Sequence, residues 1–156
     1  MAPSSRSWAV ALAGAALLGL TIFGALAWRS VRVEQADETD AFRRFEEVRR
    51  EFGSTPLVHW APGGTLTRMP AQMPRGTRPA KLHVLAYRSA EERVIQADVP
   101  LWFFKVKGPA ADYALRGTGF DLTTLGLTAG DLEQAGAGLV LDETGANGDR
   151  LLAWTE

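Results

Sequence analysis

The sequence KLHVLAYRSAEERVIQADV, residues 81–99, contains the two clearest β-strands of the chain. Within residues 93–99 the apolar side chains alternate with polar ones, which is the two-residue period of a half-buried strand. Residues 81–88 are apolar on both faces, so we expect this strand to lie inside a sheet. Residues 89–92 form a short connection, which is typical of antiparallel neighbours. The stretch therefore predicts an antiparallel sheet.

Strand patterns on either side extend this sheet. Downstream, residues 138–142 and 150–155 flank the dipeptide Asn147-Gly148, which predicts a hairpin closed by a type I′ turn. Upstream, residues 57–60 and 65–68 form a second strand pair around a Pro-Gly-Gly turn. We expect four to six strands in all.

A helix is predicted over residues 31–52, where Gly53 ends it. Four apolar residues fall on one seam of this helix: Ala41, Phe45, Val48 and Phe52. We expect the seam to pack on the domain that follows. The alternative is a short coiled coil that joins two chains, but two heptads are marginal for that purpose.

Shorter helices are predicted in the second half of the chain. Residues 109–116 start with proline and precede a glycine, and residues 121–127 suggest one further turn. Thr128 and Asp131 have the spacing of a capping box. We expect these short helices to pack on one face of the sheet, giving an α+β domain.

Two segments admit more than one interpretation. Residues 100–107, PLWFFKVK, are the most aromatic stretch and fit either a strand or a helix. Aromatic rings beside lysines can stack nucleic-acid bases or lie at a lipid surface, but a core element with two solvated lysines is the simpler explanation. Residues 69–79 contain three prolines and predict a loop, either a connector or a binding element.

The N-terminal part of the sequence predicts membrane anchoring. Trp8 to Trp28 is a run of uncharged residues, with Arg6 and Arg29 just outside it. At about 1.5 Å rise per residue, a helix of this length spans the roughly 30 Å hydrocarbon layer, and tryptophan favours the membrane interface. We therefore expect the lipid bilayer to be a partner through Trp8–Trp28. The alternative is a signal peptide cleaved after Ala27, at an A-x-A site.

The anchor itself offers few further signals. A stripe of small residues could let two such helices approach closely: Ala11, Ala15 and Gly19. Basic residues near the two ends, Arg6 against Arg29 and Arg32, do not strongly favour either orientation. We expect the C-terminal domain to be extracytoplasmic, as is common for a short N-terminal tail followed by one helix.

Charge is unevenly distributed along the chain, although the net charge is only −1. Residues 53–111 hold eight Lys or Arg against three acids, whereas residues 112–156 hold two Arg against eight acids. A basic middle segment could bind nucleic acid. We instead expect the two segments to pack together and partly cancel, so nucleic acid is an unlikely partner.

Motifs that would indicate chemistry are missing or incomplete. The chain has no cysteine, and its two histidines, His59 and His83, lack metal-site spacing. Residues 142–149 resemble a calcium loop but do not place oxygen ligands at the required positions. Residues 117–119 do not complete a phosphate-binding glycine motif, and no G-x-S-x-G occurs. We therefore assign no catalytic, cofactor-binding or metal-binding residue, and expect no cofactor.

The sequence thus predicts four regions: a tail (1–7), a transmembrane helix (8–28), a juxtamembrane helix (29–53) and a soluble α+β domain (54–156). We expect a single-pass membrane protein whose domain binds a partner protein or ligand near the membrane surface, or a second copy of itself. The alternative is a membrane-tethered hydrolase that uses dispersed carboxylates or His83.

Overall fold

The computed structural model describes residues 31–53, 55–61, 65–68, 78–105, 115 and 117–156. The predicted anchor, residues 8–28, lies outside these ranges, as do the loop residues 69–77 and all but Leu115 of the helix expected at 109–116. Within the described ranges, no helix has the length and apolar character needed to cross a membrane.

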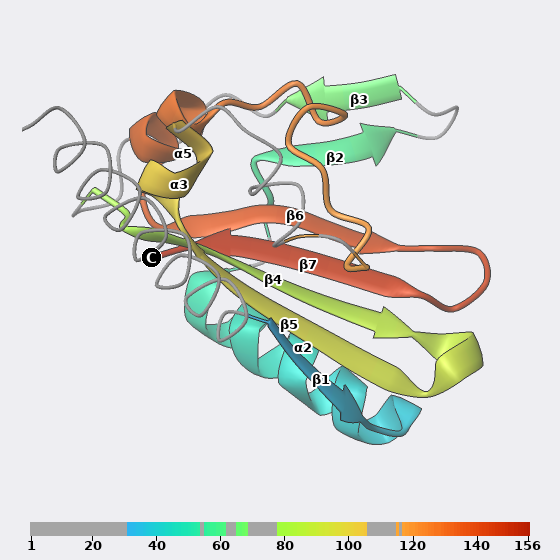
Figure 1. Cartoon of the computed structure of the whole chain (residues 1–156). Helices are drawn as coiled ribbons and strands as arrows, with labels where there is room; N and C mark the ends of the chain where they lie inside the picture. Colours follow the sequence, from blue (N-terminus) through green and yellow to red (C-terminus); the bar gives the residue numbers. More distant parts are fainter. Residues whose placement is uncertain (1–30, 54, 62–64, 69–77, 106–114, 116) are drawn as a thin grey trace, which may run out of the picture.

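The described residues form an α+β domain built on a five-stranded sheet, in which every neighbouring pair is antiparallel. Its strands, in spatial order, are β1 (Val31–Gln35), β5 (Arg93–Pro100), β4 (Lys81–Arg88), β7 (Arg150–Thr155) and β6 (Gly138–Thr144). A separate hairpin is made by β2 (Val58–Ala61) and β3 (Thr65–Arg68). Figure 1 shows this hairpin stacked above β6. The antiparallel sheet and the predicted strand pairs are confirmed, but β2 and β3 form a sheet of their own and do not extend the larger one.

Strand β4 is central, as its two apolar faces predict. It pairs with β5 on one side and with β7 on the other, and its residues 82–87 are all buried. Both of its faces must therefore be covered by other elements.

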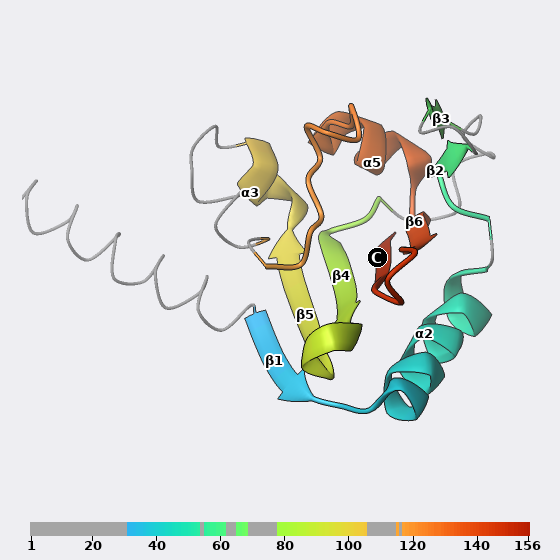
Figure 2. The same ribbon diagram turned by 90° about the vertical axis from the view of Figure 1, so that its right-hand side faces the viewer.

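Helices lie on both faces of the sheet (Figure 2). On one face α2 (Glu38–Phe52) packs over β4, β5 and β7. The opposite face is covered by α3 (Leu101–Lys105), α5 (Ala129–Ala135) and the turns at 117–127. The short helices of the second half, α3 and α5, share one face of the sheet, as expected. The longer helix α2 covers the other face, because an inner strand that is apolar on both faces needs a layer on each side.

Helix α2 confirms the predicted apolar seam but starts later than predicted. Phe45 is fully buried in the core beneath the sheet, and Val48 and Phe52 pack against the same core. Asp37 caps the helix by accepting a hydrogen bond from the backbone N–H of Asp40 at 2.8 Å. Gly53, with φ of 89°, ends it.

The first part of the predicted helix is instead strand β1, so the helix predicted from residue 31 is wrong there. Residues 31–35 pair with Arg93–Ala97 of β5. The sequence VRVEQ alternates with period two, which favours a strand. Pairing with β5 stabilises this strand and outweighs the helical pattern of the residues that follow it. The sheet therefore begins upstream of residue 54, where we expected the domain to start.

The remaining local predictions are largely confirmed. The Thr128 hydroxyl accepts a bond from the Asp131 backbone N–H, and the Asp131 carboxylate accepts one from the Thr128 backbone, which completes the capping box. The hairpin between β6 and β7 forms, but its predicted type I′ turn is wrong. That turn needs positive φ at two central residues, and here Gly148 has it (φ 85°) whereas Asn147 does not.

The basic middle of the chain pairs with its acidic tail, as predicted. Among the described residues, four ion pairs of Lys or Arg join the two segments: Arg68–Asp131, Arg78–Glu133, Lys105–Glu133 and Arg88–Asp149. Because most of these side chains are substantially exposed, each pair adds little stability. Their main consequence is that the two opposite charges partly cancel on the folded surface.

One ion pair is better placed to hold two layers together. The guanidinium of Arg49 on α2 donates two bonds of 2.7 Å to the Asp142 carboxylate on β6, and a third, of 2.6 Å, to Glu46. Asp142, the largest influence, raises the pKa of Arg49 above its ordinary value. The pair fixes α2 against the edge strand in a geometry that lysine cannot reproduce.

We predict that Arg49→Lys and Asp142→Asn each lower the free energy of unfolding by about 1–3 kcal/mol, since each breaks the two-bond contact. Urea unfolding of the full chain in mild detergent, followed by circular dichroism, measures this. Arg50→Lys is the matched control, because Arg50 is exposed on the same helix. Equal stability of all three variants would show that the pair is not a significant link.

Candidate functional site

The strongest cluster of titratable groups in the described domain surrounds His83. His83 on β4 lies directly opposite Asp98 on β5, and its Nδ1 is 2.6 Å from an Asp98 carboxylate oxygen. The imidazole stacks on Trp154 of β7, with ring centroids 5.1 Å apart and planes inclined by 16°. His83 is only 8% exposed, so three adjacent strands fix the ring in one orientation.

The other ring nitrogen faces a second carboxylate. Nε2 of His83 lies 3.1 Å from Oε1 of Glu156 but makes no hydrogen bond. Backbone bonds between Glu156 and Lys81 hold this carboxylate beside the start of β4.

His83 also determines the electrostatics of Asp98. The hydrogen bond from the ring, with a weaker one from Gln96, holds the pKa of Asp98 below its ordinary value, and partial burial opposes this shift. The positive charge of Arg32 on β1 acts in the same direction. Asp98 is therefore an ionised acceptor that orients the imidazole.

This cluster supports a structural role better than catalysis. The two carboxylates lie at opposite nitrogens of one ring, so they cannot converge on a single metal ion with it. Among the described residues, no group of three or more suitable side chains could hold a metal. The hydrogen-bond partners found for His83 and Asp98 are each other and Gln96, so no serine or threonine hydroxyl is placed for the imidazole to activate.

The other candidate residues are dispersed. His59 lies on β2, in the separate hairpin. The carboxylates of the calcium-like loop point to different partners, Asp142 to Arg49 and Asp149 to Arg88. Residues 117–119 lie in turns, and Gly117 and Gly119 have positive φ.

The aromatic stretch at 100–107, which fitted either a strand or a helix, forms helix α3 in its described part. Leu101 and Phe103 are buried in the core, whereas Trp102 is 52% exposed. The segment is thus mainly a core element, as we expected, with one aromatic ring left at the surface.

The sheet also presents an open edge that the sequence did not reveal, because residues 31–35 were assigned to a helix. Ala36 donates its backbone N–H to Glu92 at 3.0 Å. Since backbone groups alternate in direction along an antiparallel strand, those of Val31, Val33 and Gln35 point away from β5. No backbone partner for them occurs in the described part of the chain. Val33 is also 54% exposed.

The opposite edge of the sheet is covered. The backbone N–H of Leu57 bonds to the carbonyl of Leu139 on β6 at 3.0 Å. The N–H of Trp60 bonds to the Glu143 carboxylate, also on β6, at 2.8 Å. The outer edge of β1 is therefore the edge at which a further strand could join this sheet.

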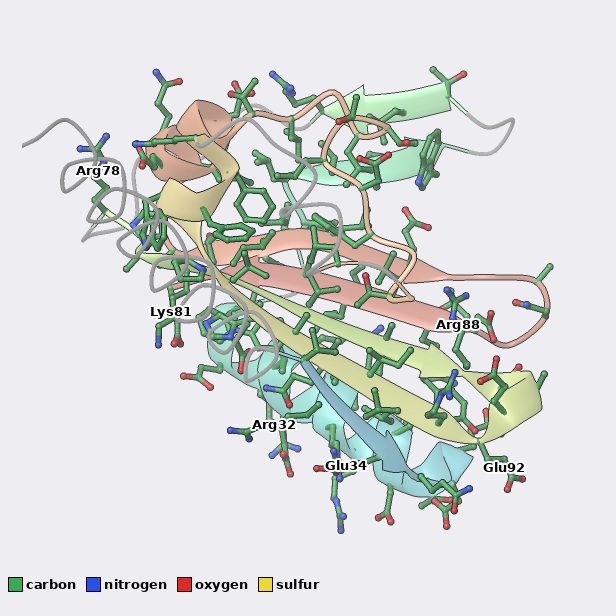
Figure 3. The ribbon with its side chains drawn as sticks, in the orientation of Figure 1. Arg32, Glu34, Arg78, Lys81, Arg88 and Glu92 are labelled. Carbon is green, nitrogen blue, oxygen red and sulfur yellow. The ribbon has the colours of Figure 1, made fainter. Side chains whose placement is uncertain are left out.

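The charged side chains of β1 lie on its α2 side, and Figure 3 shows Arg32 and Glu34 beside this strand. Glu34 pairs with Arg44 of α2 at 2.8 Å. Arg32 has no ion pair among the described residues. The edge thus carries one basic and one acidic side chain, two residues apart.

In comparisons with known proteins, no protein-family model, curated protein or solved structure matches this chain.

We predict that Asp98 stabilises the fold in a pH-dependent manner. Because its folded pKa is lowered, its contribution is complete above its unfolded pKa of about 3.9 and is lost as pH falls through the folded value. Asp98→Asn should therefore lower the urea midpoint at pH 6 and have a smaller effect at pH 3. Glu47→Gln, at an exposed site on α2, is the control and should change neither midpoint.

Proposed function

We propose that this chain is a single-pass membrane-anchored protein whose domain binds a partner protein at the membrane surface through the outer edge of β1. The role is binding and not catalysis. The observation that carries the proposal is the open edge of β1, which begins three residues after the last residue of the predicted anchor.

The short connection supports a position close to the bilayer. Three residues reach at most about 10 Å, so Trp28 at the interface would keep Val31 within that distance of the membrane. The start of the sheet could therefore neither rise far above the lipid nor rotate freely. A partner in or on the same membrane would meet β1 before any more distant part of the domain.

The edge itself supports recognition of a strand. Three residues of β1 direct outward backbone groups that have no partner in the described part of the chain. Strand addition uses such groups for affinity and the alternating side chains for specificity. Val33 supplies an exposed apolar contact, and Arg32 and Glu34 supply charges of opposite sign. The His83 ring, in contrast, is buried, and its Nδ1 is held by Asp98 within the same sheet.

The anchor is tested by topology. A reporter active only outside the cytoplasm, fused after Glu156, should give a signal that remains in the membrane pellet after alkaline extraction. A signal in the soluble fraction would mean cleavage after Ala27, and a signal only from a reporter active inside would place the domain on the cytoplasmic side.

The binding edge is tested by photo-crosslinking in membranes. A photoreactive residue at position 33 should form discrete protein adducts. The same residue at position 42, where Phe42 is 46% exposed on α2, should form none of them. Identical adducts from both positions would exclude β1 as the specific binding edge.

A further inference from the structure

We infer that β1 pairs antiparallel with β1 of a second copy of this chain, centred on Val33. The inference rests on the proposed function, because it names the partner that the edge binds. This pairing would make the five-stranded sheet of one copy continuous with that of the other.

The sequence of β1 is self-complementary in this register. With Val33 opposite Val33 of the second copy, Arg32 lies opposite Glu34 of the second copy, and Glu34 lies opposite its Arg32. Opposite charges directly across an antiparallel pair are favourable, and like charges are unfavourable. Both copies use the same patch, as a two-fold interface requires.

The backbone also fits this register. Val33 is one of the residues whose N–H and C=O point outward, so the two central valines would exchange a pair of backbone hydrogen bonds. Their side chains lie on the α3 side of the sheet, where Val33 sits beside Ile95 of β5. Each valine would cover the other, which accounts for an exposed β-branched residue at a sheet edge.

The charged side chains on the α2 side would also gain partners. Glu34 is already held by Arg44 at 2.8 Å, so it is positioned to accept a second cation. Arg32 is exposed and has no ion pair among the described residues, and in the pair it would meet the Glu34 of the second copy.

The geometry is compatible with two anchors in one bilayer. In this register the two Val31 positions are four residues apart along the strands, which is about 14 Å. Connections of up to about 10 Å on each side can bring two helices into contact at the usual spacing of 8–10 Å.

The anchor also explains how so small a contact could suffice. A five-residue strand pair is smaller than a standard interface of about 1,600 Å² and would be weak between freely diffusing domains. Confinement to one membrane raises the effective concentration of the second copy.

The first test uses the absence of cysteine from the chain, which makes introduced thiols specific. Val33→Cys in the full chain, in native membranes, should form a disulfide dimer on mild oxidation, because opposite Cα atoms in such a pair lie about 5.5 Å apart. Trp102→Cys, of matched exposure at 52% against 54%, is the control and should crosslink roughly tenfold more slowly. Equal rates would overturn the inference.

Charge exchange provides the second test, in the Val33→Cys background. Arg32→Glu and Glu34→Arg each place like charges opposite one another and should reduce crosslinking about five- to tenfold. The double variant Arg32→Glu/Glu34→Arg should restore it, and so should mixing the two single variants. Arg44→Gln, which removes only the internal partner of Glu34, should leave crosslinking unchanged.

The results separate this inference from the proposed function. If the exchange fails to restore the dimer, or if crosslinks at position 33 join this chain to a different protein, then the second copy is the wrong partner. Crosslinks to a different protein would still support the proposed binding through β1. If the chain is found in the soluble fraction, anchoring fails, while the charge exchange still decides whether two β1 edges pair. Circular dichroism of each variant confirms that the fold is retained.

Discussion

The structure depends on burying both faces of β4. This strand has apolar side chains on each side, so the domain must build one layer with α2 and another with α3, α5 and the turns at 117–127. Leucines and valines fill the second layer, whereas the first also accommodates the stacked rings of His83 and Trp154. With β4 third of five strands, the two edges of the sheet fall on β1 and β6. Among the described residues, the β2 segment bonds to β6, and the β1 edge stays open.

Local sequence signals predicted those helix ends and strands whose conformation depends on adjacent residues. The capping box at Thr128, the stop at Gly53 and the alternation along 93–99 each depend on a few adjacent residues. Strand β1 was missed although VRVEQ alternates, because five residues do not outweigh the longer helical pattern that follows them, and the pairing with β5 lies about 60 positions later. The cluster around His83 also depends on pairing between strands. His83 and Asp98 are 15 residues apart, and strand register, not motif spacing, brings them together.

The fold explains the uneven distribution of charge along the chain, because it brings the basic middle segment beside the acidic tail. Arginines and lysines from the middle segment form ion pairs with aspartates and glutamates of the tail, at the α3–α5 layer and at the turn between β6 and β7. Exposed pairs of this kind contribute little to the free energy of unfolding. Among the described residues they place carboxylates beside several cations of the middle segment, so its positive charge is partly cancelled on the folded surface. The sequence predicted this partial cancellation, although it could not predict which residues pair.

Charges on the outer strand of a sheet usually protect it from unwanted pairing. On β1 the pattern is mixed, with Arg32 and Glu34 on one side and valines on the other. An edge bearing one sign of charge would repel its own copy in every register. A mixed edge repels most registers and most foreign strands, but it accepts its own antiparallel copy in one register only, since a slip by two residues places a charge opposite a different group. In the proposed pairing, the residues that limit promiscuous pairing would be the same residues that specify the partner, and a nearby anchor would supply the proximity that so short a strand needs.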